Sequence, residues 1–287
     1  MAIDPSSNLY FESFGPANAP SIVFLHGGGV AGWMWRKQIE ALKGEYHCLA
    51  PDLPEQGENA ARGDTQPFTT TGAAERISAF IRSQAHGGKA HVVGLSEGAQ
   101  VTVELLSRSP ELVDHAMVSS AMLRPMWVLK VYTPGLVAWS YRWFVTPFKN
   151  NDWWIRLNAH SSGISDDYYT DFKHSFQTTT ESSLVNLMLA GFNYRLPPGL
   201  EKAHVPVPVL VAVGNKEYKE MQESGRDLLA ALPNSRGVIV SLGPKVTLVQ
   251  EHSWAMTAPA LFTATLKAWI EDRPLPGELK PLQRPKK

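Results

Sequence analysis

The sequence predicts an α/β protein with a doubly wound, mostly parallel sheet and a helical cap inserted into it. Short apolar runs typical of buried strands alternate along the chain with segments of helical periodicity. Strands that alternate with helices pair in parallel through right-handed crossovers. The alternation stops between residues 122 and 200 and then resumes. We therefore expect a core from residues 1–121 and 201–272, a cap or lid from residues 122–200, and a loose, Pro- and Lys-rich C-terminal tail at 273–287.

In the first half of the chain, each expected element has a local signal. The strand at 8–14 ends at a Gly-Pro turn, and the strand at 21–25 is continuously apolar, as in a strand buried on both faces. A helix at 33–42 leads to the strand at 47–53. After a polar loop, the helix at 71–86 places its apolar residues on one face.

The second half repeats the same pattern on either side of the expected cap. Its strands are short apolar runs, and its helices carry apolar residues at helical spacing. The strands are expected at 90–93, 114–120, 207–213 and 237–242, and the helices at 99–107, 217–232 and 258–270.

Composition and charge exclude several classes of function. The 287 residues carry a formal net charge of +0, which gives no electrostatic reason to expect nucleic acid or an acidic membrane as a partner. Cys48 is the only cysteine, so an intramolecular disulfide and a cysteine-based metal cluster are excluded. The apolar window at 126–145 contains a Pro-Gly pair and two basic residues, so no membrane span is expected. The N-terminus lacks signal-peptide features, and a cytoplasmic location is the expectation. The oligomeric state is left open.

The stretch at residues 94–98, Gly-Leu-Ser-Glu-Gly, predicts a nucleophilic serine. It follows an apolar run that reads as a strand and precedes a helix, which is the context of the nucleophile elbow. Such a turn leaves no room for a β-carbon at its flanks, which explains Gly94 and Gly98. Ser96 at its apex is expected in a strained conformation, with its hydroxyl directed away from the sheet.

A serine hydroxyl needs a base, and the base needs an orienting carboxylate. Glu217 is the candidate acid because it follows a buried strand that ends at Gly214, whereas the strand that ends near Ser120 is followed by no carboxylate. Of the nine histidines, His252 is the candidate base because it lies between the last expected core strand and the last helix. Glu251 is the alternative carboxylate for orienting the base.

A glycine-rich segment at residues 26–29, His-Gly-Gly-Gly, ends the strand that neighbours the elbow strand. Glycines there let backbone N–H groups approach a substrate oxygen without side-chain interference. Backbone N–H groups of Gly28 and Glu97 are therefore the candidate oxyanion hole. We expect His26 to brace the loop by hydrogen bonding. A phosphate cradle is a weaker interpretation because no Gly-Lys-Ser/Thr follows.

Together these motifs resemble the α/β-hydrolase superfamily from about residue 8 to residue 270, and they look most like its bacterial esterase-like members with a helical cap. The resemblance implies a catalytic triad of Ser96, His252 and Glu217, with oxyanion donors at Gly28 and Glu97, and it specifies no substrate. We interpret the protein as a serine hydrolase that cleaves a small-molecule carboxylic ester through an acyl-enzyme, with no metal and no organic cofactor. The matching pieces are His26-Gly27-Gly28, Pro51-Asp52-Leu53-Pro54 with Gly57, Gly94 to Gly98, Gly214 to Glu217, and His252 with Trp254, Pro259 and Trp269.

Three positions depart from the pattern of that superfamily. Residues 54–57 read Pro-Glu-Gln-Gly where Pro-Gly-His-Gly is usual, so this loop can have a different shape. The acid is Glu where Asp is commoner. Glu251 stands where a glycine often precedes the histidine, and its carboxylate could compete for His252.

The expected cap is rich in aromatic residues. They suggest an apolar or aryl substrate pocket, or equally the hydrophobic core of the cap itself. We assign Trp127, Trp139, Trp143 and Trp254 to substrate binding. Two other activities remain open: a carbon–carbon bond hydrolase or lyase on the same triad, and a ligand-binding relative with little turnover. A serine at the elbow disfavours dehalogenase or epoxide-hydrolase chemistry. Superfamily members with those activities have a similar layout but carry an aspartate as the nucleophile.

Overall fold

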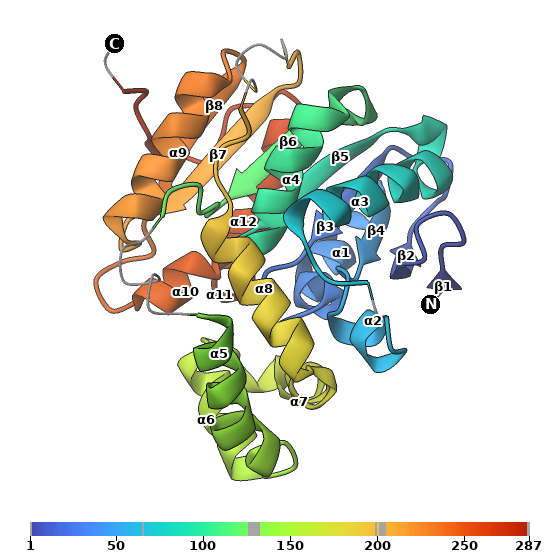
Figure 1. Ribbon diagram of the computed structural model, residues 1–287. Coiled ribbons are helices and arrows are strands. Elements are labelled where there is room, and N and C mark those ends of the chain that lie inside the picture. The colour runs from blue at the N-terminus through green and yellow to red at the C-terminus, as the bar shows by residue number, and fades with distance from the viewer. Residues whose placement is uncertain (1, 65, 126–132, 199, 201–204, 286–287) are drawn as a thin grey trace.

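The computed structural model of the protein describes residues 2–64, 66–125, 133–198, 200 and 205–285 (Figure 1). Within these residues, nine strands form one sheet in the order β1-β2-β4-β3-β5-β6-β7-β8-β9. The strands from β4 to β8 in this order are parallel, while β1, β2 and β9 pair antiparallel at the two edges. The predicted mostly parallel α/β sheet is therefore confirmed. Its strands are β1 (Ala2–Ile3), β2 (Tyr10–Phe14), β3 (Ser21–Leu25), β4 (His47–Pro51), β5 (Ala90–Leu95), β6 (Val113–Ser119), β7 (Val209–Gly214), β8 (Ser235–Val240) and β9 (Lys280–Pro281).

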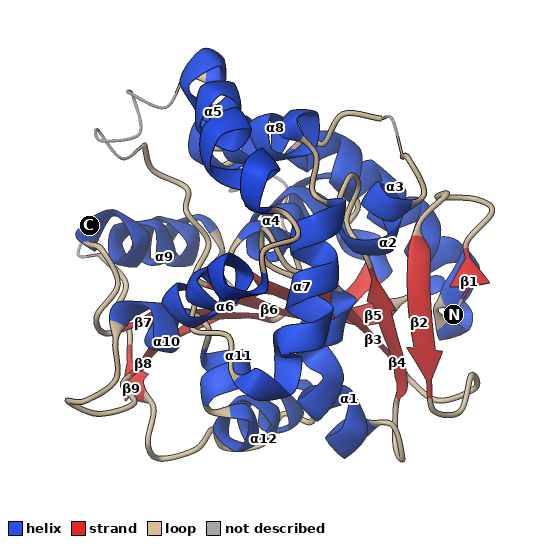
Figure 2. Cartoon of the chain, turned by 90° about the horizontal axis from the view of Figure 1, so that it is seen from below, coloured by secondary structure: helices blue, strands red, loops and turns tan. Residues whose placement is uncertain are grey.

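Helices cover both faces of the sheet, as the alternation of strands and helices predicts. One buried apolar cluster joins the sheet to α3, α4 and α9, and a second cluster joins its other face to α1, α11 and α12. Figure 2 shows these two layers on opposite sides of the strands. The core helices are α1 (Arg36–Leu42), α2 (Gly57–Ala61), α3 (Thr70–Gln84), α4 (Glu97–Arg108), α9 (Lys219–Ala231), α10 (Leu248–His252), α11 (Trp254–Thr257) and α12 (Pro259–Ile270).

Successive residues of a central strand serve both clusters because strand side chains alternate between faces. Val92 of β5 belongs to the cluster under α3 and α4, while Val93 belongs to the cluster under α1 and α12, and both are fully buried. This two-sided burial is why the parallel strands appear in the sequence as continuous apolar runs.

The segment expected as a cap holds helices and, in its described part, no strand. These helices are α5 (Pro134–Ser140), α6 (Asp152–Ser161), α7 (Tyr169–Thr178) and α8 (Glu181–Asn193), and a π-helical turn at Tyr141–Val145 follows α5. Figure 1 shows α5 and α6 projecting from the body of the molecule, with α8 leading back to the core. No helix in the described part of the chain is long and apolar enough to cross a membrane.

The C-terminal segment differs from the loose tail expected there. Lys280 and Pro281 form β9 against β8, and Leu282 is buried with the core cluster. Arg284 donates hydrogen bonds to backbone carbonyls that include those of Leu229 and Pro233. The guanidinium thus satisfies carbonyls at the end of α9, an interaction that the Pro- and Lys-rich composition does not reveal.

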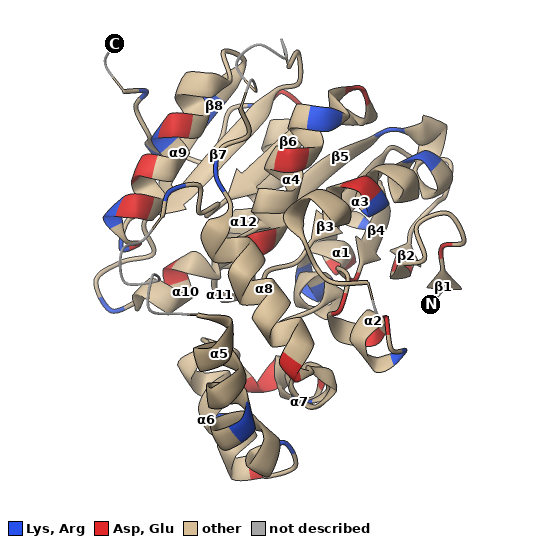
Figure 3. Ribbon diagram, in the orientation of Figure 1, with Lys and Arg blue, Asp and Glu red and all other residues tan. Residues whose placement is uncertain are grey.

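Basic and acidic residues are interspersed over the outer helices, for example along α9 (Figure 3). This distribution agrees with the balanced composition of 27 basic and 27 acidic residues.

Candidate active site

The strained turn expected at Ser96 is present. Ser96 lies between β5 and α4 with φ 56° and ψ −111°, a region that non-glycine residues rarely adopt. Its backbone N–H donates to the carbonyl of Ser119 at 2.8 Å. A β-carbon at Gly94 would lie 2.3 Å from the carbonyl oxygen of Gly98, and one at Gly98 would lie 2.2 Å from that of Leu25. The two glycines therefore allow β3, the turn and α4 to pack closely.

His252 and Glu217 meet, although 35 residues separate them in the chain. The distance from His252 Nδ1 to Glu217 Oε1 is 2.7 Å, and the other carboxylate oxygen of Glu217 accepts the backbone N–H of Gly214 at 2.9 Å. Glu217 lies in the turn between β7 and α9 and is 6% exposed, so its carboxylate is held in one orientation. His252 is the last residue of α10 and lines the same cavity as Ser96.

Glu251, the alternative acid, has a different environment. Its side chain is completely buried, and its two oxygens accept the backbone N–H groups of Lys216 at 2.6 Å and Leu242 at 3.1 Å. It therefore ties the turn after β7 to the segment after β8. The structure brings Glu217, and not Glu251, to the histidine.

Aromatic packing fixes the segment that carries His252. Trp254 is 1% exposed, its ring centroid lies 4.6 Å from that of Phe262, and its Nε1 donates to Ser119 Oγ at 2.9 Å. Phe262 in turn contacts Trp35, with ring centroids 5.4 Å apart. This cluster joins α11 and α12 to the sheet immediately beyond His252.

The glycine segment after β3 passes beside the elbow. A β-carbon at Gly27 would lie 3.6 Å from Ser96 Cβ, and a β-carbon at Gly28 would lie 3.5 Å from Glu97 Oε2. Glu97 is the first residue of α4, where a backbone N–H has no acceptor within its own helix. The structure thus brings the residues of the two expected oxyanion donors, Gly28 and Glu97, close to each other.

His26 has the bracing contacts expected of it. Its ring is fully buried, Nε2 accepts the backbone N–H of Leu53 at 2.8 Å, and Nδ1 lies 2.8 Å from the carbonyl oxygen of Gly27. Burial lowers the pKa of His26 to about 4, so the ring is neutral at neutral pH.

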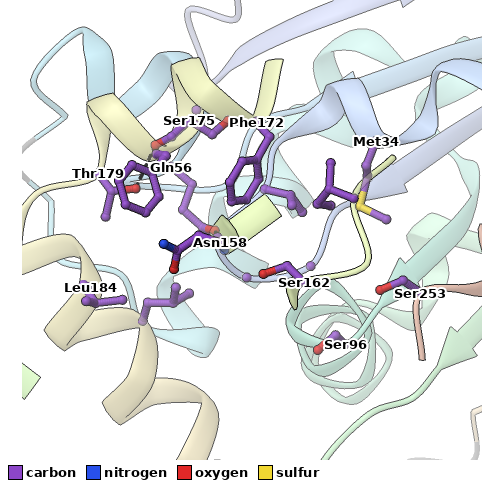
Figure 4. Close-up of a pocket in the computed structure, with 18 of the residues that line it drawn as sticks. Met34, Gln56, Ser96, Asn158, Ser162, Phe172, Ser175, Thr179, Leu184 and Ser253 are labelled. Atoms are coloured by element: carbon purple, nitrogen blue, oxygen red, sulfur yellow. Dashed lines mark hydrogen bonds between the residues drawn. The ribbon is translucent and has the colours of Figure 1, made fainter. Parts of the chain in front are cut away.

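A cavity of about 480 Å³ opens at Ser96. In Figure 4, Ser96 lies on one side of this space, and Phe172, Ser175 and Thr179 lie across it. The cap segment supplies both apolar and polar walls. The apolar ones are Tyr141, Val145, Ile164, Phe172, Phe176, Leu184 and Leu187, and the polar ones are Asn158, Ser161, Ser162, Ser175, Thr179 and Ser183.

Of the tryptophans assigned to substrate binding, Trp139, Trp143 and Trp254 are not among the residues that line this cavity. Trp139 and Trp143 are on the outside of the cap segment, 51% and 63% exposed, and Trp254 is part of the buried cluster described above. Trp127 lies outside the described residues. A count of aromatic residues cannot tell which face of a helix points inward, and this is why the assignment does not match the structure.

Sequence reasoning also passed over two polar residues of the cavity wall. Gln56 and Glu55 lie in the atypical loop at residues 54–57 and are 6% and 7% exposed. Glu55 has φ 58° and accepts hydrogen bonds from the backbone N–H of Phe68 and from the Asn186 side chain of α8. The sequence signal for these two residues was that positions 54–57 read Pro-Glu-Gln-Gly where Pro-Gly-His-Gly is usual.

The fold is that of the α/β hydrolases, and the chain belongs to the α/β-hydrolase family. The model described as "Alpha/beta hydrolase family" matches residues 22–274. The predicted membership is therefore confirmed.

The individual relatives either share low sequence identity with this chain or match only part of it. The "Uncharacterized hydrolase YugF" of Bacillus subtilis is 26% identical over 258 residues, 85% of this chain and 89% of that protein. An "AB hydrolase superfamily protein" of Gibberella zeae is 32% identical over 131 residues, 45% of this chain and only 42% of that protein. The solved structure of a thermophilic esterase from Thermogutta terrifontis matches with a TM-score of 0.65 and 18% identity, over 92% of this chain and 93% of that one. At that identity the likeness concerns the fold.

Proposed function

We propose that the protein is a serine hydrolase of the carboxylesterase kind, which cleaves small carboxylic esters through an acyl-enzyme on Ser96. The observation that carries the proposal is the 2.7 Å contact between His252 and Glu217, at the wall of the cavity that Ser96 also lines. A nucleophile, a base and an orienting carboxylate are the parts that acyl transfer requires.

Each residue has a distinct role in the proposed reaction. His252 removes the proton of the Ser96 hydroxyl as its oxygen attacks the ester carbonyl carbon, and it returns the proton to the leaving alcohol. Glu217 accepts a hydrogen bond from the Nδ1–H of His252, which keeps Nε2 free to act as the base and stabilises the imidazolium. Water then attacks the acyl-enzyme by the same route and releases the acid.

The backbone N–H groups of Gly28 and Glu97 would hold the oxyanion of the tetrahedral intermediate. Removing one such donor costs about 3–4 kcal/mol of transition-state stabilisation. Both N–H groups belong to fixed backbone, so little reorganisation accompanies the reaction.

The cavity favours an acyl group with apolar and polar parts. Phe172, Phe176 and Leu187 offer apolar surface, whereas Asn158, Ser162 and Thr179 offer hydrogen-bonding groups. The lining is mainly apolar, with these polar groups interspersed, and this supports the apolar substrate expected from the aromatic content of the cap.

A fluorophosphonate probe and hydrolysis of p-nitrophenyl butyrate test the proposal. Wild type should label on Ser96, and Ser96→Ala should lose labelling and at least about 10⁴-fold in kcat. His252→Ala should lose activity to a similar extent. Ser253→Ala is the matched control for labelling, because Ser253 lines the same cavity. A wild type that neither labels nor hydrolyses the ester contradicts the proposal and favours a ligand-binding relative.

A further inference from the structure

One side-chain amide connects the glycine segment to the nucleophile elbow. Gln56 Oε1 accepts the backbone N–H of Gly29 at 3.1 Å, and Gln56 Nε2 donates to Glu97 Oε2 at 2.8 Å. Gln56 and Glu97 are each only 6% exposed. The amide therefore joins the two backbone segments from which the proposed oxyanion donors come.

Glu97 is an unusual residue to bury there. Among the described residues, no Lys or Arg forms an ion pair with it, whereas Glu104, two turns further along α4, pairs with Arg108. Burial raises the pKa of Glu97 to about 8, and the hydrogen bond from Gln56 opposes part of this shift. The carboxyl group is therefore mostly protonated at neutral pH.

Titratable groups on the neighbouring elements are already engaged with other partners. His26, beyond β3, contacts Leu53 and Gly27, and His252 on α10 contacts Glu217. Glu55 accepts from Phe68 N–H and Asn186, Asp52 accepts from Gly32 N–H and Glu58 N–H, and Glu104 accepts from Thr71 and Tyr194. The pKa of Glu97 is accordingly set by burial and by the Gln56 hydrogen bond, and no charged neighbour in the described part of the chain contributes to its shift.

The position of this carboxyl group matters for an oxyanion. Glu97 Oε2 lies 3.5 Å from where a β-carbon of Gly28 would be, so the carboxyl group lies against the segment whose N–H would bind the oxyanion. A negative charge there opposes the second negative charge of the tetrahedral intermediate, and low solvent exposure strengthens the repulsion. A protonated carboxyl group causes no such repulsion and still accepts the hydrogen bond from Gln56.

We propose that Gln56 and Glu97 are positioning residues that hold the glycine segment against the elbow, and that the oxyanion hole works only while the Glu97 carboxyl group is protonated. The inference rests on the proposed function of Ser96. It predicts a loss of activity at alkaline pH that belongs to a side chain outside the triad.

The test measures kcat, KM and the rate of fluorophosphonate labelling from about pH 6 to about pH 10, with each profile normalised to its own maximum. In wild type, kcat and the labelling rate should fall by at least about tenfold above about pH 8, with KM changing little. Glu97→Gln should abolish this alkaline decline, because an amide accepts the Gln56 hydrogen bond but does not ionise. Glu104→Gln, at a buried carboxylate of the same helix, should keep it.

Gln56→Leu tests the positioning role separately. It removes both hydrogen bonds of the bridge at every pH, so kcat should fall by about tenfold or more across the whole profile, with the larger effect on kcat than on KM.

A stability measurement adds a readout that needs no turnover. When the pKa of a carboxyl group is higher in the folded than in the unfolded protein, the folded protein becomes less stable as pH rises between those two values. The free energy of unfolding of wild type should therefore fall, relative to Glu97→Gln, between about pH 4.5 and about pH 8.

Three results would overturn the inference. They are coincident wild-type and Glu97→Gln profiles, a decline lost equally in Glu104→Gln, and unchanged kcat in Gln56→Leu. If wild type labels normally and one of these three results is obtained, the proposed function stands and only this inference fails. A wild type that never labels at any pH overturns the proposed function and this inference together.

Discussion

Substitution of Glu217 should lower kcat, whereas substitution of Glu251 should lower stability, although both are buried carboxylates close to His252. In Glu217→Gln the contact to His252 Nδ1 loses its negative charge, so the histidine is no longer held in the tautomer that serves as base. By analogy with the same change in a serine-protease triad, kcat should fall by about 10⁴-fold, or about 5.5 kcal/mol of activation free energy. The folded state loses at most the hydrogen bond from Gly214 N–H, about 1–2 kcal/mol.

Glu251→Gln should instead act on folding. Both oxygens of this fully buried side chain accept backbone N–H groups, at 2.6 and 3.1 Å, and a glutamine offers only one oxygen. Losing charge from both bonds and turning an NH₂ group towards one N–H should cost about 3 kcal/mol or more of unfolding free energy. The kcat of the folded fraction should change by less than about tenfold.

Urea unfolding, combined with active-site titration before the ester assay, separates the two effects. Titration gives kcat per folded site, so instability of Glu251→Gln is not mistaken for a catalytic defect. The reasoning is refuted if Glu251→Gln lowers kcat per site as much as Glu217→Gln does while its unfolding midpoint stays at the wild-type value.

Further predictions follow from burial and steric fit. Gly98→Ala should lose about 3 kcal/mol or more of stability by urea unfolding, because its β-carbon would lie 2.2 Å from the backbone oxygen of Leu25, and recovery of wild-type stability would contradict this. Acidification should destabilise the protein partly through His26: its pKa, about 4, is lower in the folded than in the unfolded protein, so up to about 3 kcal/mol is lost as pH falls from about 6.5 to about 4. His26→Gln should show a correspondingly smaller fall in unfolding free energy over that range. Trp143→Ser should change kcat/KM by less than about twofold, because the side chain is 63% exposed and does not line the cavity. Phe172→Ala, at a buried wall residue, should change kcat/KM by more than about tenfold for a long acyl chain and stability by about 3 kcal/mol.

The order of elements and the elbow were predictable because each depends on local sequence. Apolar runs define the strands, and only glycine fits at positions 94 and 98, so the pattern around Ser96 carries its own geometry. The position of His252 after the last core strand followed from connectivity, because the carboxyl ends of parallel strands share one edge.

The choice between two carboxylates could not be made from the sequence. Glu251 and His252 are consecutive on α10, where successive side chains point about 100° apart, so adjacency in sequence does not bring them together. The inward faces of the cap helices were equally beyond prediction, because a segment without strands offers no register that fixes orientation. The Gln56 bridge depends on two partners, Gly29 and Glu97, that only the fold brings close.

The residues of the proposed site lie far apart along the chain, and this has a consequence during synthesis on the ribosome. Ser96 leaves the ribosome well before Glu217 and His252, since chains are made from the N-terminus. A growing chain therefore carries the proposed nucleophile without its proposed base until β7, β8 and α10 have emerged and docked. Burial of Trp254 against Phe262 requires α12 as well. On the proposed mechanism the serine should stay inert on nascent and truncated chains, and its reactivity towards a fluorophosphonate should mark the moment at which the last core helix docks.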